Sequence, residues 1–339
     1  MNITKRLQQG RQLDRDQHKE KEVLKVGTLR AGNTGMMSST GDFAGACPRT
    51  VHLRQLGHEL EVPDDSKMIM FQMGIANESV VFKDLMHTSG PDEVILQEEE
   101  IPISWLTSNG TKVTGRPDMV LCRRTGSVGD SELHPKVEGQ TIPFLGIEIK
   151  SIASVWTSRE VLFEGQPKLP HLLQAAHYSW KLGVPFRLIY KQYSNQAVPG
   201  WAGKLFPKQG EPHSQHISYN EKGDIKYIEP FEIAYELEWD SSSRKYLRYR
   251  REIGEGEKEL DWTRTLISQQ DIERFYEFVA NMQETKVLGV RPMTIDAQGN
   301  EKNYSNCGYC PLKDTCDKYE SKGYEKWMAA VLAQMSSIK

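Results

Sequence analysis

A short apolar run with two charged residues inside it most constrains the fold of this chain. In residues 142–152, Ile147 and Ile149 alternate with Glu148 and Lys150, and a run of this length is typical of a strand buried at the centre of a sheet. Successive strand side chains point to opposite faces, so the glutamate and the lysine share one face. We therefore expect a central strand that carries an acid and an amine side by side.

The segments around this strand predict a mixed α/β core. Residues 70–85 have helical periodicity and stop before the Ser-Gly-Pro at 89–91. Residues 94–106 and 112–123 resemble two strands of a hairpin that turns at Ser-Asn-Gly 108–110. A helix is expected over 169–182 and a strand over 185–193, which completes the order helix, strand, strand, strand, helix, strand.

The bulk composition neither indicates nor excludes a nucleic-acid partner. With 339 residues, a net charge of −3 and a pI near 6.3, any such binding must come from a local basic patch. No apolar run approaches the roughly 20 residues that span a bilayer, and residues 1–30 are charged throughout. We expect a cytoplasmic protein without a membrane partner.

Two acids and a lysine have the spacing of a hard-cation site. Asp118, after Gly115-Arg116-Pro117 in the predicted strand 112–123, and Glu148, on the next predicted strand with Lys150, are expected at the ends of adjacent strands. Carboxylates bind Mg²⁺ or Mn²⁺ through oxygen, and a lysine can orient a water or offset charge on a phosphate. An acid beside a lysine is more often a solvated pair, but within a buried strand unpaired charges need a metal or a partner.

Two further motifs flank these residues, and together the four resemble the RecB-like branch of the PD-(D/E)xK nuclease superfamily. Gly74-Ile75-Ala76-Asn77-Glu78 lies on the first predicted helix, and Gln174-Ala175-Ala176-His177-Tyr178 lies on the helix after the lysine strand. The resemblance covers roughly residues 47 to 320. It implies a restriction-endonuclease-like core, with a mixed central sheet flanked by helices.

The resemblance also implies roles for these residues. Glu78 would be a third metal ligand, the Ile149 carbonyl would complete the shell, and Lys150 would position the attacking water. Gln174 would hold the water or a phosphate oxygen, and Tyr178 would stack on or hydrogen-bond the nucleic acid. A solvent-facing Glu78 and an ordinary amphipathic helix are the alternatives, and a glutamate in place of the expected histidine leaves Mg²⁺ against Mn²⁺ open.

Four of the five cysteines have the pattern of a metal cluster. Cys307, Cys310 and Cys316 lie close together, and Cys47 is the natural fourth ligand. Prolines follow Cys47 and Cys310, which favours a 4Fe-4S cluster over the alternative, structural Zn²⁺. The remaining Cys122 is expected to be a buried inert thiol.

The cysteine arrangement resembles the CRISPR-associated RecB-like exonucleases and the AddB nuclease domain, in which the cluster ties the chain ends together. It suggests a division by residue number: 1–40 a charged N-terminal extension and loop, 41–66 the first cluster-ligand segment, 67–195 the nuclease core, 196–267 an inserted or appended sheet, and 268–339 a helical C-terminal region with the three-cysteine segment. A helix is expected after an N-cap at Ser268, and another over 323–335.

The densest basic segment is the candidate DNA-binding strand. It interleaves cations with aromatic rings, a composition that can grip phosphates while bases stack. Basic residues also protect exposed sheet edges from aggregation, which is the alternative. The candidate DNA contacts are Arg116, Arg244, Lys245, Tyr246, Arg248, Tyr249, Arg250 and Arg251.

By resemblance, the expected activity is exonucleolytic cleavage of single-stranded or end-bearing DNA, 5′ to 3′. The setting would be recombination, repair, phage DNA metabolism or CRISPR spacer acquisition, in the host cytoplasm if the protein is viral. The sequence contains no phosphate-loop motif, so an ATP-driven motor would be another protein. A homo-oligomer, a helicase or integrase partner, and a non-catalytic iron-sulfur DNA-binding or scaffold subunit of a helicase-nuclease complex remain open.

Overall fold

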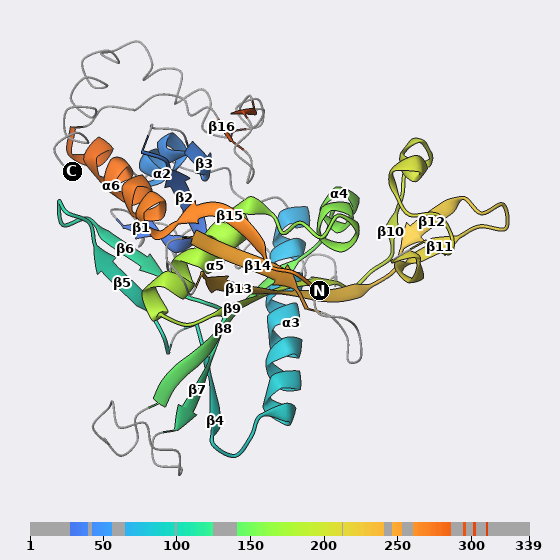
Figure 1. Cartoon of the computed structure of the whole chain (residues 1–339), viewed down its shortest axis with the longest axis horizontal. Helices are drawn as coiled ribbons and strands as arrows, with labels where there is room; N and C mark the ends of the chain where they lie inside the picture. Colours follow the sequence, from blue (N-terminus) through green and yellow to red (C-terminus); the bar gives the residue numbers. More distant parts are fainter. Residues whose placement is uncertain are drawn as a thin grey trace, which may run out of the picture. The chain divides into compact units, whose positions relative to one another are not determined.

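The computed structural model describes residues 28–39, 43–55, 65–98, 100–124, 141–211, 213–240, 246–252, 260–285, 294–295, 301–302 and 310. They fall into two compact units (Figure 1). The terminal unit comprises the described parts of Met1–Ile69, Ile103–Gly115 and Leu266–Lys339. The sheet unit comprises those of Met70–Pro102 and Arg116–Thr265.

A seven-stranded mixed sheet forms the centre of the sheet unit. Strands β8 and β9 are parallel, whereas β4–β7, β7–β8, β9–β13 and β13–β14 are antiparallel. The expected mixed α/β fold with a central mixed sheet flanked by helices is confirmed. In spatial order the strands are β15 (Thr263–Ser268), β14 (Tyr246–Arg251), β13 (Phe231–Trp239), β9 (Phe186–Gln192), β8 (Thr141–Ser151), β7 (Met119–Arg124) and β4 (Glu93–Gln97).

Burial of the β8 isoleucines decides where its charged residues point. Ile147 and Ile149 belong to a buried apolar cluster with Val81 of α3 (Asp65–Thr88) and with side chains of β4, β7 and β9. Because side chains alternate along a strand, Glu148 and Lys150 lie on the opposite face of β8. The apolar pattern thus sets the direction of the charged pair.

Helix α5 (Leu169–Leu182) packs on β8, β9 and β13. Its Tyr178 ring lies 6.1 Å from the ring of Phe186, measured between centroids. A Cβ atom at Gly146 would overlap the Phe186 ring, so glycine permits this close approach. The short helices α4 (Val155–Ser158) and η2 (Arg159–Phe163) connect β8 to α5.

The terminal unit is built around helix α6 (Gln269–Thr285), which packs on β2 and on α2 (Pro48–Gln55). As expected, Ser268 caps α6, because its Oγ accepts a 3.0 Å hydrogen bond from the Asp271 N–H. Tyr276 fixes the helix to the chain start through a 2.8 Å contact with the Thr34 hydroxyl. The strands of this unit are β1 (Leu29–Arg30), β2 (Gly35–Met37), β3 (Phe43–Gly45), β5 (Ile103–Leu106), β6 (Lys112–Gly115), β16 (Thr294–Ile295) and β17 (Glu301–Lys302).

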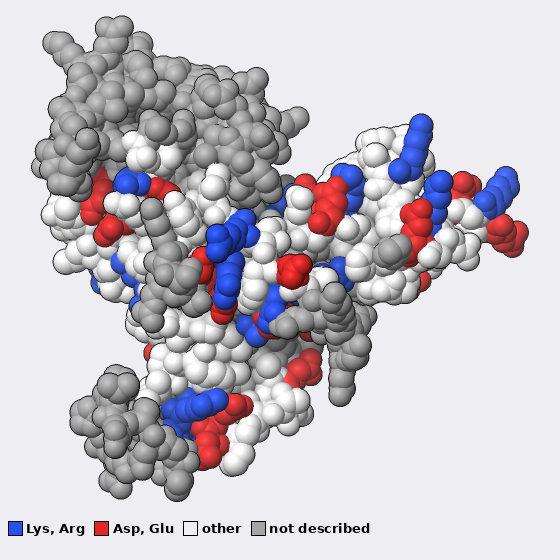
Figure 2. All heavy atoms as spheres, viewed as in Figure 1, with Lys and Arg blue, Asp and Glu red and all other residues white. Residues whose placement is uncertain are grey.

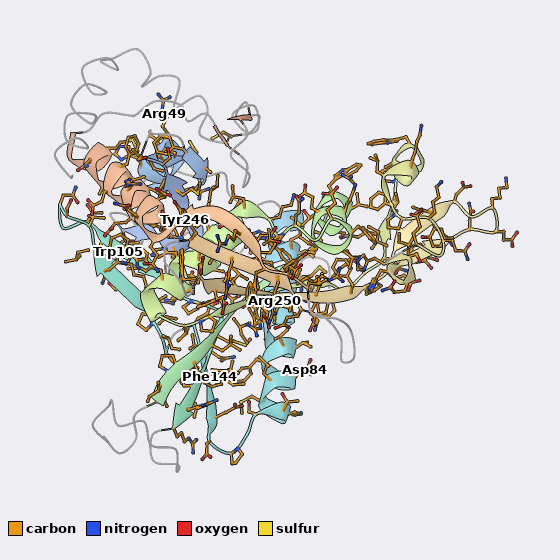
Figure 3. The ribbon with its side chains drawn as sticks, viewed as in Figure 1. Arg49, Asp84, Trp105, Phe144, Tyr246 and Arg250 are labelled. Atoms are coloured by element: carbon orange, nitrogen blue, oxygen red, sulfur yellow. The ribbon has the colours of Figure 1, made fainter. Side chains whose placement is uncertain are left out.

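The expected hairpin exists only near its turn. Strands β5 and β6 pair around Gly110, which has a φ of 82° as the turn requires, and Trp105 of β5, labelled in Figure 3, packs edge-on against Tyr276. The two long strands of the prediction are each interrupted, so that β4 and β7 belong to the central sheet and β5 and β6 to a separate sheet with β1. Pro102 and Pro117 lie in the interruptions, where a residue without an N–H cannot continue the ladder.

Residues 196–267 were expected to form a separate sheet, but they contribute to two. Strands β13, β14 and β15 extend the central sheet, because β13 pairs along its length with β9. Only β10 (Gln196–Ala197), β11 (Ile217–Tyr219) and β12 (Ile225–Ile228) form a small sheet of their own, drawn in yellow in Figure 1. The expected helix over 323–335 and the N-terminal extension before residue 28 lie outside the described residues.

In the described part of the chain, no helix combines the length and the apolar character needed to cross a membrane.

Candidate metal centre

Three adjacent strands bring three acids into one row. Gln97 of β4 pairs with Met119 of β7, and Met119 pairs with Ile147 of β8. If each register is continued by one residue, the position of Glu98 falls opposite that of Asp118, and the position of Asp118 falls opposite that of Glu148. Directly opposed residues have Cβ atoms about 5 Å apart, so the strand pairing places these three positions near one another.

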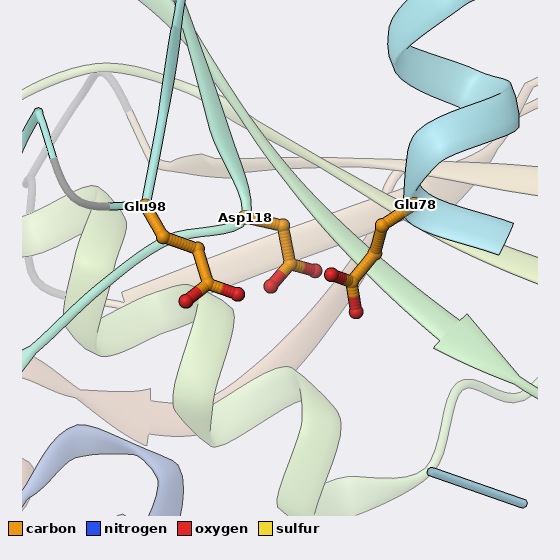
Figure 4. Close-up of side chains that lie close together, drawn as sticks. All are labelled: Glu78, Glu98 and Asp118. Carbon is orange, nitrogen blue, oxygen red and sulfur yellow. The ribbon is translucent and has the colours of Figure 1, made fainter. Parts of the chain in front are cut away.

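Glu78 reaches the same place from helix α3. Figure 4 shows the carboxylates of Glu78, Glu98 and Asp118 turned toward one another. One oxygen from each lies within 4.8 Å of the others, a spacing that a single cation can bridge. All three side chains are half-buried. The helix is fixed at this level by Asn77, whose side-chain amide donates a hydrogen bond to Ser151 at the end of β8.

Asp118 and β8 are also joined directly. The N–H of Ile149 donates a 2.6 Å hydrogen bond to Asp118 Oδ2, and this bond orients the carboxylate at the start of β7. The Ile149 backbone therefore lies at the site, as the resemblance implies. A metal bond from its carbonyl stays a prediction.

Glu148 is the most constrained acid of the site. It is fully buried, at 0% exposure, and its Oε1 accepts a 2.5 Å hydrogen bond from Lys150 Nζ. Its Oε2 is buried and has no hydrogen-bond partner among the described residues. A buried carboxylate oxygen without a partner is unfavourable, so this atom fits a ligand for a cation.

Burial, and after it the neighbouring carboxylates, raises the pKa of the acids. Burial raises the pKa of Glu78 to about 7, and the carboxylates of Glu98 and Glu148 act in the same direction. Burial also raises the pKa of Asp118 well above its usual range and raises the pKa of Glu148, although Lys150 opposes both shifts. A bound cation would offset this repulsion.

The same carboxylates favour the charged form of Lys150. Burial disfavours its ammonium form, but the carboxylates of Glu148 and Asp118 outweigh burial and raise the pKa of Lys150 above its ordinary value. The side chain is therefore protonated at neutral pH. This charge suits an amine that holds a water or a phosphate oxygen, rather than one that removes a proton.

The donor set fits a hard divalent cation. Oxygens of Glu78, Glu98 and Asp118 converge, and Glu148, which lies outside this group of three, is close enough to raise the pKa of Glu78 and of Asp118; such oxygen ligands suit Mg²⁺ or Mn²⁺. The sequence motifs predict Glu78, Asp118 and Glu148 as ligands, but they do not include Glu98. It follows an apolar strand in the run Gln97-Glu98-Glu99-Glu100, and the strand pairing, if correctly registered, would have placed it opposite Asp118.

Helix α5 adds a polar group near the site, His171, which is not part of the sequence motifs. His171 Nδ1 lies 3.1 Å from the Tyr190 hydroxyl. Burial, with the charges of Lys150 and Lys168, lowers the pKa of His171 to about 3, so the imidazole is neutral at physiological pH. His171 lies three residues before Gln174, a spacing that puts both on one side of the helix.

Gln174 and Tyr178 contact each other. The Gln174 amide donates a 3.2 Å hydrogen bond to the Tyr178 hydroxyl. Tyr178 is only 2% exposed, so its ring packs inside the protein and offers no free face for a nucleic-acid base. In this conformation the tyrosine orients Gln174, and the stacking role expected of it has no support in its position.

The cysteines are described only in part. Cys47 and Cys310 are half-buried, whereas Cys307 and Cys316 lie outside the described residues. Cys310 Sγ lies 3.8 Å from the Thr50 hydroxyl, in the first turn of the helix that begins right after Cys47. Cys310 therefore lies beside the helix that Cys47 precedes. Cys122 is buried as expected, and burial raises the pKa of its thiol.

The expected DNA-binding strand is β14, and its cations have acidic partners. Arg248 pairs with Glu238, and Arg250, labelled in Figure 3, donates a 2.5 Å hydrogen bond to Glu236. Both guanidinium groups lie 4.6 Å from the Trp262 ring centroid. This cross-strand network accounts for the cations without nucleic acid, so their DNA contact stays a prediction.

The remaining candidate contacts differ in accessibility. Arg116 is exposed two residues before Asp118, Tyr246 is 37% exposed, and Tyr249 is buried. Arg244 and Lys245 lie outside the described residues, and Arg251 donates a 3.0 Å hydrogen bond to the Leu162 carbonyl. On the face in Figure 2, basic and acidic side chains are interspersed. Arg116 therefore has the best position for reaching a phosphate beside the acids.

No protein-family model matches this chain, and no curated protein matches it significantly.

Proposed function

We propose that this protein is a divalent-metal-dependent DNA nuclease of the PD-(D/E)xK class. One observation carries the proposal: Glu148 is fully buried, its Oε1 is bonded to Lys150, and its Oε2 has no hydrogen-bond partner among the described residues. A binding or scaffold role requires no such arrangement. Metal-dependent phosphodiester hydrolysis uses a cation site, and a positive group beside it can offset charge on the phosphate.

Four acids would hold the cation, and each has a different support. Asp118 is oriented by the Ile149 N–H, Glu148 by Lys150, and Glu78 by the rigid helix α3. Glu98 completes the group from the end of β4. A bound Mg²⁺ or Mn²⁺ supplies Lewis-acid chemistry, which polarises the phosphate and lowers the pKa of a bound water.

Lys150 and Gln174 would act on the reacting groups. The protonated Lys150 would orient the attacking water and offset charge that develops on the phosphate, while it stays bonded to Glu148. Gln174, oriented by Tyr178, would hold the water or a phosphate oxygen. Arg116 is close enough along the chain to hold a neighbouring phosphate.

The finer assignment follows the resemblance to the RecB-like branch. We propose exonucleolytic cleavage of single-stranded or end-bearing DNA, 5′ to 3′, with a 4Fe-4S cluster on Cys47, Cys307, Cys310 and Cys316. The contact between Cys310 and Thr50 supports a cluster at this place. Such a cluster would be structural, because it would close a very long loop of the chain.

Cleavage of end-labelled DNA tests the proposal. Linear and circular substrates, single- and double-stranded, are incubated with Mg²⁺ or Mn²⁺, and the product ladder gives substrate and polarity. Lys150→Ala should abolish cleavage and keep DNA affinity, and the exposed Lys222→Ala is the matched control. Full cleavage by the Lys150→Ala variant would exclude the proposed centre.

A further inference from the structure

An exposed pair of tryptophans lies beside the small sheet of the sheet unit. Trp156 of α4 and Trp201 of η3 (Gly200–Leu205) have ring centroids 5.5 Å apart, with planes 34° from parallel. Trp201 is 70% exposed and Trp156 is 37% exposed. Such large aromatic rings are normally buried, so this exposure needs a reason.

The pair is rigidly supported from below. The Trp156 ring packs on Phe206, which is buried, and Phe206 packs edge-on against Phe163. The Arg159 side chain donates a 3.0 Å hydrogen bond to the Leu205 carbonyl and so joins η3 to the helix that follows Trp156. The Trp156 ring is therefore packed against the protein, and Trp201, which contacts it, is mostly exposed.

Charge around the pair favours an anionic ligand. Residues 195–210 contain Lys204 and Lys208 and no acid, although Glu211 follows and accepts a 2.7 Å hydrogen bond from the Lys208 N–H. Both lysines are exposed, and Lys204 has no ion-pair partner among the described residues. The acids after Trp156 are paired, Glu160 with Lys168 and Glu164 with Arg159. A planar ring with free cations nearby is how proteins bind single strands: the base stacks and the phosphate meets the amine.

The chain places this pair near the candidate metal centre. Trp156 follows Lys150 by only six residues, which bounds their separation at about 20 Å even for an extended chain. Stacking requires unpaired bases, because a duplex keeps its bases stacked on each other. DNA bound here would have to be single-stranded for one of its bases to stack on Trp201.

We propose that Trp156 and Trp201 form a stacking platform for single-stranded DNA that feeds the metal centre. The inference rests on the proposed nuclease function and names the form of its substrate. A protein partner could also cover an apolar patch. The two occupants differ in what they need: a base needs the ring of Trp201, whereas a protein would also use Leu205, which is 46% exposed on the same helix.

Fluorescence anisotropy of a labelled oligothymidylate of about 16 nucleotides, the upper site size of a single-strand-binding fold, tests the platform. The full chain is used with EDTA, so that binding is measured without cleavage. Trp201→Ala should weaken binding about 5- to 100-fold, the loss expected for one stacked base. Trp201→Phe should keep part of the affinity, and Leu205→Ala and the affinity for duplex DNA should not change.

Three outcomes overturn the platform: the parent protein fails to bind the oligonucleotide, Trp201→Ala binds like the parent, or Leu205→Ala loses as much affinity as Trp201→Ala. A separate cleavage assay of the parent with Mg²⁺ or Mn²⁺ distinguishes the two proposals. If the parent cuts DNA but Trp201→Ala binds normally, only the platform fails. If the parent binds through Trp201 but cuts nothing, only the nuclease fails.

Discussion

At the scale of the residue, the two oxygens of Glu148 have opposite environments. Oε1 is bonded to Lys150, whereas Oε2 is buried without a partner in the described chain. An unsatisfied buried acceptor costs about 1 to 3 kcal/mol, and more when the group is charged. A cation at this atom would remove that penalty and stabilise the folded protein.

Glu98 gives the sharpest test of the ligand set. If it binds the cation, Glu98→Gln should raise the Mn²⁺ concentration for half-maximal cleavage at least about tenfold, as for other changes to metal-site ligation. Glu100→Gln is the matched control, because Glu100 is an exposed neighbour in the same acidic run. If both variants needed the same Mn²⁺ concentration for half-maximal cleavage, Glu98 would not be a metal ligand.

Glu78 predicts a pH dependence of metal-free stability. Its pKa is raised to about 7 in the folded state from 4.5, so the folded protein binds the extra proton between these values. Stability contributed by Glu78 therefore falls as pH rises from about 4.5 to about 7. Relative to Glu78→Gln, the metal-free parent should lose about 1 to 2 kcal/mol across this window, after allowing for solvent screening.

Urea unfolding of both proteins in EDTA at several pH values measures this difference. The comparison with Glu78→Gln is needed because burial lowers the pKa of His171 and of His177 to about 3, which makes stability rise with pH over an overlapping window. Both proteins contain those histidines, so their contributions cancel in the difference between the two unfolding free energies. A difference that does not change with pH would show that Glu78 does not titrate in this window.

At the scale of the element, the meeting of β8 with β9 depends on one glycine. Gly146→Ala would place a Cβ atom in the Phe186 ring, and overpacking of this kind costs about 1 to 3 kcal/mol. Gly203→Ala is the control, because nothing lies within 4 Å of a Cβ there and its φ is not positive. Urea denaturation should show Gly146→Ala destabilised by this amount and Gly203→Ala within about 0.5 kcal/mol of the parent.

If Gly146→Ala were as stable as the parent, β8 would not pack as closely on the Phe186 ring as the structure shows. The site would also be affected by this change, since Glu148 lies two residues further along the same strand face. Helix α5 belongs to this packing through Tyr178, which contacts both Phe186 and Gln174. The core and the site therefore share one set of contacts.

At the scale of the whole molecule, both units are assembled from segments far apart in the sequence. The terminal unit joins α2, the β5–β6 hairpin and α6, and Cys310 lies beside the start of α2. Closing so long a loop costs chain entropy, which the packing of α6 on β2 and α2 must offset. The proposed cluster at the four cysteines would add a bonded closure to this packing.

Cys310→Ser tests the proposed cluster. The parent should be brown when purified anaerobically, and the variant should lose both its iron and its resistance to limited proteolysis in the terminal unit. Cys122→Ser is the matched control, since Cys122 is a buried thiol in β7 and should leave colour and iron content unchanged. If the parent were colourless and contained stoichiometric zinc, the four cysteines would hold zinc and not an iron-sulfur cluster.

The sequence by itself located the main helices, the central strand and most of the residues proposed for the site. Apolar periodicity located α3, α5 and β8, since the pattern reflects burial that any fold must satisfy. It also pointed to Asp118, Glu148 and Lys150, because a charge within a buried strand is rarely without a partner. Glu78 came from the resemblance, and the structure brings it to the same place.

Only the tertiary structure decided what depends on strand register and sheet membership. Glu98 joins the site because β4 and β7 pair with one particular offset, which local pattern does not specify when strands are interrupted at Pro102 and Pro117. The arginines of β14 form ion pairs with glutamates of β13 because of the register between these two strands, which the local sequence does not specify either. Residue type fixes which groups can do chemistry, but long-range pairing fixes which of them meet.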